Sequence, residues 1–292
     1  SFDERKVGDG TVITPYWVQN DDKPILGADN FKKVIPHSVK GQIHYTIQSS
    51  YVRPAELRDD DIQDMKGFIE MAVENEYVFK GVSISAYASP DGESALNENL
   101  AGDRAESAEK AVSRILKRAK VDAAKEEGFF KLEGKGEDWA GFEAAVKKSD
   151  IEDKDLILNV LKMESDLAKR EADIKNMAKT YVELADKILP ELRRSQITLN
   201  ADEMSRTDDE IKQLASSNDT ALSVEELLYA ATLTDDINEQ LKIYNAVKTN
   251  YPKDWRGPNN VGYIYMLQSK VSEAGSSFET PGDLHAGIPI II

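Results

Sequence analysis

The sequence predicts an α+β fold for residues 41–200, followed by an all-α segment. Two stretches, 41–48 and 81–87, alternate apolar and polar residues, which is typical of strands. The stretches after each of them carry apolar residues at helical spacing, and from residue 221 the pattern is helical only. The resulting order β-α-β-α-β favours a sheet with helices packed on one face.

Composition narrows the classes of function. The chain has 292 residues, which suggests two domains or one domain with a long elaboration, and 40% of the residues are hydrophobic, which is enough for a real core. A net charge of -16 argues against nucleic acid or an anionic membrane as the main partner. The absence of cysteine excludes disulfides and thiolate sites, and the three histidines are far apart, so we expect neither a metal nor a cofactor. No apolar run approaches the roughly 20 residues that span a bilayer.

The first elements follow from periodicity. Residues 1–40 are expected to form an N-terminal strand and loop extension, with a possible strand at 11–18. In the strand at 41–48, Ile43, Tyr45 and Ile47 share one face. An amphipathic helix then follows three aspartates, which suit the positive end of its dipole. Its apolar residues are Ile62, Met65, Phe68, Ile69 and Ala72.

The middle of the chain continues the same alternation of elements. The strand at 81–87 places Val82, Ile84 and Ala86 on one face. The next helix is expected to bury Leu100, Ala105, Ala108, Val112, Ile115 and Leu116. A third strand is expected at 129–132, and a strand at 193–199 is expected to return to the sheet and close the domain.

Three further segments complete the expected organisation. Residues 137–192 are predicted to be a charged helical insertion, anchored by Trp139, Phe142, Leu156, Ile157 and Leu161. Residues 201–220 are polar and are expected to be a linker. Residues 279–292 are expected to be an irregular tail, because their prolines and glycines do not continue a helix.

A polar turn and a distinctive helix follow the strand at 81–87. The turn reads Ser-Pro-Asp-Gly, and the helix opens with Asn-x-Asn-Leu-Ala-x-x-Arg-Ala. Residues 41–199 resemble the OmpA-like domain, the peptidoglycan-associating C-terminal domain of outer-membrane protein A, of the Bacteroidetes type. The insertion at 137–192 is similar to that of Bacteroidetes members. The residues that fall on the family pattern are Tyr87, Gly92, Asn97, Leu100, Arg104 and Ala105.

This resemblance implies non-covalent binding of peptidoglycan. In the family, an Asp after the strand and the Arg of Arg-Ala clamp the diaminopimelate of the stem peptide. A carboxylate binds the ammonium of this zwitterion and a guanidinium binds its carboxylate through two parallel hydrogen bonds. The ligand-binding residues so implied are Tyr87, Ser89, Asp91, Gly92, Asn97 and Arg104.

The sequence departs from the family at one of these positions. Ser89 stands where the family has its ligand-binding Asp, and Asp91 lies two residues beyond. Loss of one side of the clamp costs on the order of 1.5–3 kcal/mol, the range for a hydrogen bond to a charged group. A structural interpretation is also open. Asp91 would then belong to an ordinary turn, Asn97 and Asn99 would cap the helix, and Arg104 would pair with Glu98 on the surface.

Residues 221–278 resemble tetratricopeptide repeats, which implies a protein partner. In a repeat that begins at Trp255, the small and aromatic positions are occupied by Gly262, Tyr265, Ala274 and Phe278. Leu228, Tyr244 and Pro252 fall on the preceding repeat. Two repeats are fewer than a free solenoid needs, and a plain helical hairpin without a binding role is the alternative.

These observations together lead us to expect a non-enzymatic cell-envelope protein. It would be periplasmic and associated with the outer membrane through a lipid or a removed segment. It would bind peptidoglycan through one domain and an envelope protein through its repeats. The alternative is an OmpA-like scaffold that has lost the cell-wall ligand and acts only in protein assembly. An envelope enzyme is a third class, but no phosphate loop, metal-ligand cluster or nucleophile elbow appears in the sequence.

Overall fold

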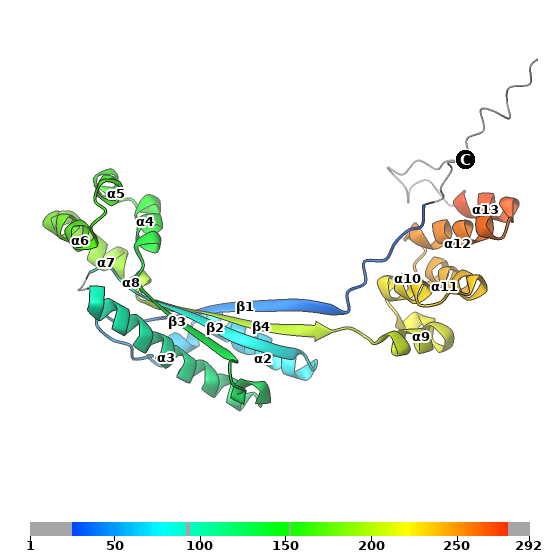
Figure 1. Cartoon of the computed structure of the whole chain (residues 1–292), viewed down its shortest axis with the longest axis horizontal. Coiled ribbons are helices and arrows are strands. Elements are labelled where there is room, and N and C mark those ends of the chain that lie inside the picture. The colour runs from blue at the N-terminus through cyan, green and yellow to red at the C-terminus, as the bar shows by residue number, and fades with distance from the viewer. Residues whose placement is uncertain (1–24, 92–93, 152, 280–292) are drawn as a thin grey trace, which may run out of the picture. The chain divides into compact units, whose positions relative to one another are not determined.

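A computed structural model describes residues 25–91, 94–151 and 153–279 (Figure 1). The chain divides into two compact units. Val34–Ser205 form one, here called the sheet unit. Arg206–Ile292 together with Ser1–Lys33 form the other, here called the helical unit.

The sheet unit is built on a mixed four-stranded sheet in the order β1-β4-β2-β3. Strand β4 pairs antiparallel with both β1 and β2, and β2 pairs parallel with β3. Sheet and helices occur in one chain, so the α+β prediction is confirmed. The strands are β1 (Val34–His44), β2 (Val78–Ala88), β3 (Phe130–Glu137) and β4 (Arg194–Met204).

Helices α2 (Asp60–Glu74) and α3 (Ser94–Arg118) bury their apolar stripes against the sheet in one continuous core. The helices contribute Ile62, Met65, Ile69, Ala105, Ala108 and Val112 to this core. The strands contribute Ile43, Val82, Ile84, Ile197 and Leu199. Close packing of α3 on β3 depends on Gly134, where an added Cβ would lie 2.9 Å from the backbone nitrogen of Gly102. The short helices η1 (Glu56–Arg58) and η2 (Asp122–Lys125) lie in the connections.

The first strand differs from its prediction at both ends. It begins at Val34, inside the expected extension, and stops at His44, so Ile47 lies beyond it and is 59% exposed. β1 starts earlier than predicted because the backbone of Val34 to Lys40 pairs residue by residue with β4. The side chains of these residues are mostly exposed. The possible strand at 11–18 lies outside the described residues.

Five helices fill the insertion and have their own core. Phe142 and Ile157 are fully buried there, and Trp139 and Leu161 pack partly buried against them. Leu156 was wrongly expected to join them. It is 52% exposed, because adjacent helical residues point about 100° apart. The helices are α4 (Trp139–Lys148), α5 (Lys154–Met163), α6 (Leu167–Asn176), α7 (Ala178–Lys187) and α8 (Leu189–Leu192).

The helical unit has a separate core of its own, the third in the described part of the chain. Its elements are α9 (Asp208–Ser217), η3 (Asp219–Ala221), α10 (Val224–Thr232), α11 (Ile237–Asn250), α12 (Arg256–Leu267) and α13 (Val271–Phe278). The expected linker at 201–220 is wrong, because β4 runs to Met204 and α9 occupies most of the remainder. A capping box of Thr207 and Glu210 starts α9, and Ile211 anchors it in the core. The expected tail at 279–292 lies almost entirely outside the described residues.

None of the helices in the described part of the chain combines the length and the apolar character needed to cross a membrane.

Candidate ligand-binding pocket in the sheet unit

A cavity of about 620 Å³ lies where β2 ends and α3 begins. Its walls come from the turn after β1, from the β2–α3 connection and from the first turns of α3. The residues that line it are Ile47, Gln48, Ser89, Asp91, Leu96, Asn97, Asn99, Leu100, Asp103 and Arg104. The structure therefore brings together four of the six predicted ligand-binding residues, Ser89, Asp91, Asn97 and Arg104.

Arg104 is buried and rigidly held, although it lines the cavity. Its side chain donates three hydrogen bonds to backbone carbonyls, from Nε to Ser49 (3.0 Å), from Nη1 to Tyr87 (2.8 Å) and from Nη2 to Thr46 (3.3 Å). The guanidinium also lies 5.1 Å from the ring centre of Tyr45. The residue is only 1% exposed, so the expected alternative of a surface pair with Glu98 is wrong.

The charge of Arg104 has no carboxylate contact among the described residues. Its three hydrogen bonds go to neutral carbonyls, which leave two of its five N–H groups for other acceptors. Burial is the main cause that lowers the pKa of Arg104 to about 10; the neighbouring Arg193 acts in the same direction, while Tyr45 and Asp91 act in the opposite one. Arg104 therefore stays charged at neutral pH, and a buried cation of this kind favours an anionic ligand such as a carboxylate.

Asp91 faces a different arginine. The Nη2 of Arg193 lies 2.9 Å from Asp91 Oδ2, and its Nε donates to Ser89 Oγ at 2.9 Å. Ser89 Oγ in turn donates to Asp91 Oδ1 at 2.5 Å. The sequence analysis did not identify Arg193, and the local signal was a pair of arginines at the start of the last strand. The carboxylate of Asp91 is therefore already engaged on the wall of the cavity.

Asn97 joins the ends of two strands. Its Nδ2 donates to the backbone oxygen of Ser89 (3.3 Å) and to Glu137 Oε1 (2.9 Å). The expected role as a helix cap is wrong for Asn97 and Asn99, because α3 already begins at Ser94. Asn97 instead fixes the β2–α3 connection against the end of β3.

The remaining predicted residues are placed differently. Tyr87 contributes its backbone oxygen to Arg104, while its ring lies 5.0 Å from the guanidinium of Arg194 and does not line the cavity. Gly92 lies outside the described residues. Two exposed apolar side chains, Ile47 (59%) and Leu96 (62%), stand at the cavity and offer an apolar rim beside the charged wall.

Within the described ranges, no group of three or more His, Cys, Asp or Glu side chains is arranged to hold a metal ion.

Scans of the chain against protein-family models and against curated proteins gave no match.

Proposed function

We propose that the sheet unit is an OmpA-like domain that binds the stem peptide of peptidoglycan non-covalently. The observation that supports this most strongly is Arg104, a buried cation without a carboxylate partner among the described residues, on the wall of a cavity of about 620 Å³. A ligand carboxylate satisfies such a cation through two parallel hydrogen bonds. The resemblance places the family's carboxylate-binding arginine at this position.

The ammonium of diaminopimelate needs a negative group in the same cavity. Ser89 carries no charge and the carboxylate of Asp91 is paired with Arg193. Asp103 is exposed and lines the cavity one position before Arg104, so it supplies a free carboxylate in this proposal. Ile47 and Leu96 would contact apolar parts of the peptide.

The test is a calorimetric titration of the full chain with a diaminopimelate-containing muropeptide. Arg104→Ala should weaken binding at least tenfold, since a hydrogen bond to a charged group contributes about 1.5–3 kcal/mol. Arg114→Ala is the matched control, because Arg114 is exposed on the same helix and away from the cavity. Leu96→Asp tests the cavity without removing a buried group and should also weaken binding. Equal affinity in all four proteins would overturn the proposal.

A second function is favoured by the pairing of Asp91 with Arg193. If the ammonium subsite is lost, the unit is an OmpA-like scaffold that acts only in protein assembly. In that case the muropeptide would neither bind the wild-type chain nor raise its melting temperature.

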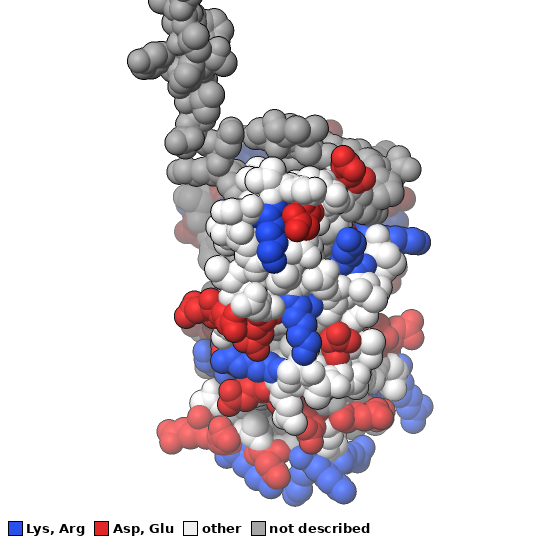
Figure 2. All heavy atoms as spheres, turned by 90° about the vertical axis from the view of Figure 1, so that its right-hand side faces the viewer, with Lys and Arg blue, Asp and Glu red and all other residues white. Residues whose placement is uncertain are grey.

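The helical unit is proposed to be a pair of tetratricopeptide-like repeats that binds an envelope protein. Support comes from Gly262, where an added Cβ would lie 2.5 Å from Phe278 Cε1, the close approach that the repeat pattern assigns to a small and an aromatic position. On the face in Figure 2, acidic and basic side chains of the described residues are interspersed, which suits a protein partner better than a polyanion. The whole protein would then be a periplasmic, non-enzymatic protein associated with the outer membrane.

A further inference from the structure

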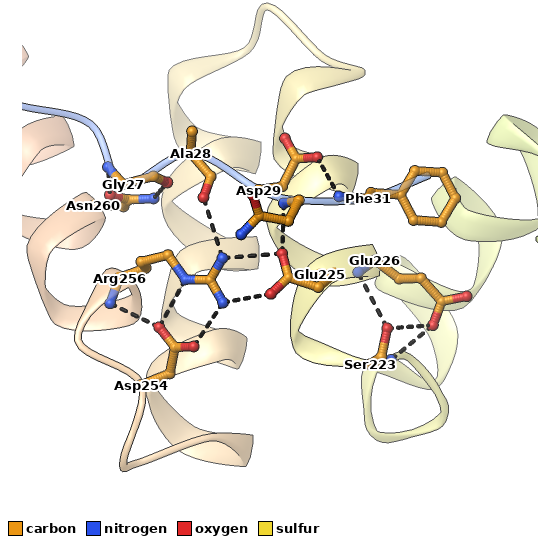
Figure 3. A network of polar contacts seen from close by, with 11 residues as sticks. Gly27, Ala28, Asp29, Phe31, Ser223, Glu225, Glu226, Asp254, Arg256 and Asn260 are labelled. Carbon is orange, nitrogen blue, oxygen red and sulfur yellow. Dashed lines mark hydrogen bonds and ion pairs between the residues drawn. The ribbon is translucent and has the colours of Figure 1, made fainter. Parts of the chain in front are cut away.

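The segment Ile25–Phe31 crosses the helices of the helical unit without forming a helix or strand (Figure 3). We propose that the helical unit is a receptor for an extended peptide and that this segment is its in-chain ligand. The proposal concerns the helical unit alone and does not depend on what the sheet unit binds.

The central contact is between the backbone of Gly27 and the side chain of Asn260. Asn260 Oδ1 accepts from the Gly27 nitrogen at 2.7 Å, and Asn260 Nδ2 donates to the Gly27 oxygen at 2.8 Å. Asn260 is completely buried. The adjacent Asn259 donates from Nδ2 to the backbone oxygen of Ile25 at 2.8 Å. One side chain thus satisfies both backbone groups of a single residue, which is how a strand would bind its neighbour.

The same site selects glycine. A Cβ added at Gly27 would lie 2.7 Å from Arg256 Cγ and 3.1 Å from Asn260 Oδ1. Arg256 has little freedom to yield, because its guanidinium is bound on one side by Asp254 (2.8 Å) and on the other by Glu225 (2.7 Å). A residue with a side chain at this position must therefore displace a network of ion pairs or leave the site.

Arg256 and Glu225 extend the backbone recognition along the segment. Arg256 Nη1 donates to the Ala28 oxygen at 3.2 Å, and Glu225 Oε2 accepts from the Asn30 nitrogen at 2.6 Å. Figure 3 shows the Gly27–Asn260 pair and, further along the same segment, the contacts of Arg256 and Glu225. The helical unit thus forms hydrogen bonds with backbone groups of residues 25, 27, 28 and 30. The side chains of Ile25 and Leu26 are 58% and 40% exposed and take no part in these hydrogen bonds.

One side chain of the segment is recognised directly. The ring of Phe31 stacks on Tyr229 with centres 4.5 Å apart and planes 24° apart. This contact fixes the register, with an aromatic residue four positions after the glycine. The peptide chemistry that fits the site is therefore an extended backbone with glycine and an aromatic residue at that spacing.

Because the segment Ile25–Phe31 already occupies the site, a separate peptide has to compete with it. A tethered ligand has an effective concentration on the order of millimolar, so a free peptide competes poorly with it. A peptide of the same chemistry binds the wild-type receptor weakly and binds well only when the in-chain segment is released.

The test uses the full chain and a fluorescent peptide with the sequence of residues 25–33. Gly27→Val should release the segment, so the exchange rate of the Asn30 amide should rise at least tenfold. The same variant should bind the peptide at least tenfold more tightly than the wild-type chain does. A peptide with valine in place of the glycine should not bind. Leu26→Val is the control in the chain, because the side chain of Leu26 is exposed and residue 26 is not among the recognised positions, and it should behave as wild type in both measurements.

Two results would overturn the proposal. The Asn30 amide of Gly27→Val could remain as protected as in the wild-type chain. Alternatively, Gly27→Val could keep protected amides in α12, which shows a folded unit, and still fail to bind the peptide.

Discussion

Arg193 and Asp91 form a buried ion pair on the wall of the cavity, with 2.9 Å between Nη2 and Oδ2 and side chains only 10% and 9% exposed. The two residues lie 102 positions apart in the sequence, so the pair ties the β2–α3 connection to the start of β4. It also neutralises the acid nearest to the position where the family has its ligand-binding Asp. The same pair therefore contributes to the stability of the unit and, in the proposed function, affects its choice of ligand.

Removal of one partner of this pair should destabilise the sheet unit strongly. Asp91→Ala leaves Arg193 buried without its counter-ion, and the free energy of unfolding should fall by about 3 kcal/mol. Urea denaturation measures the change. Arg114→Ala, on the exposed face of α3, is the control and should change little. A loss as small as that of the control would mean that the pair is effectively solvated.

Two glycines that face each other should respond in opposite ways to alanine. Gly134→Ala places a Cβ 2.9 Å from the Gly102 backbone, so α3 must move away from β3 at a cost of about 1–3 kcal/mol. Gly102→Ala meets no atom within 4 Å and should stabilise the helix by about 0.5–1 kcal/mol. Thermal unfolding of both variants checks this, and a shift of both melting temperatures in the same direction would contradict the account.

The docking of the segment Ile25–Phe31 should be lost at acid pH. Hydrogen bonds from Arg256 lower the pKa of Glu225 below its ordinary 4.5. Burial would raise the pKa of Asp254, but hydrogen bonds from Arg256 outweigh it, and the net pKa lies below the ordinary 3.8. For groups with lowered pKa values, the stabilisation is full above the ordinary value and is lost as pH falls through the lowered one.

The nitrogen–proton resonance of Asn30 reports this docking directly. Between pH 7 and pH 5 it should keep its position, and it should move toward that of the released variant Gly27→Val only below about pH 4.5. Release already near pH 6, or no release at pH 2, would contradict the assignment of Glu225 and Asp254.

The periodicity of apolar residues correctly predicted which faces of the strands are buried. Ile43, Val82 and Ile84 lie in the core as expected, because alternation reports which face of a strand is buried. The first seven residues of β1 were not predicted as a strand. They are a strand because their backbone pairs with β4, and their own sequence does not alternate apolar and polar residues. Helix α9 was missed because its stretch is mostly polar and it buries only two residues, Ile211 and Ala215.

The candidate sites depend even more on contacts that local sequence patterns cannot predict. Arg104 was singled out because it falls on the pattern of the OmpA-like domain that the sequence resembles, and it does line the cavity. Arg193 meets Asp91, and Asn260 meets Gly27, across 102 and 233 positions of sequence. No local pattern encodes such contacts, since they exist only once the elements have packed.

The most direct test of the central claim is to locate the bound muropeptide by nuclear magnetic resonance on the full chain. We predict that a diaminopimelate-containing muropeptide shifts the Arg104 side-chain resonance and the amides of Ser89, Leu96 and Asn97, which line the cavity. Amides of the helical unit should stay in place. Shifts confined to another surface, or no shifts at millimolar ligand, would contradict the proposal that this cavity binds the cell wall.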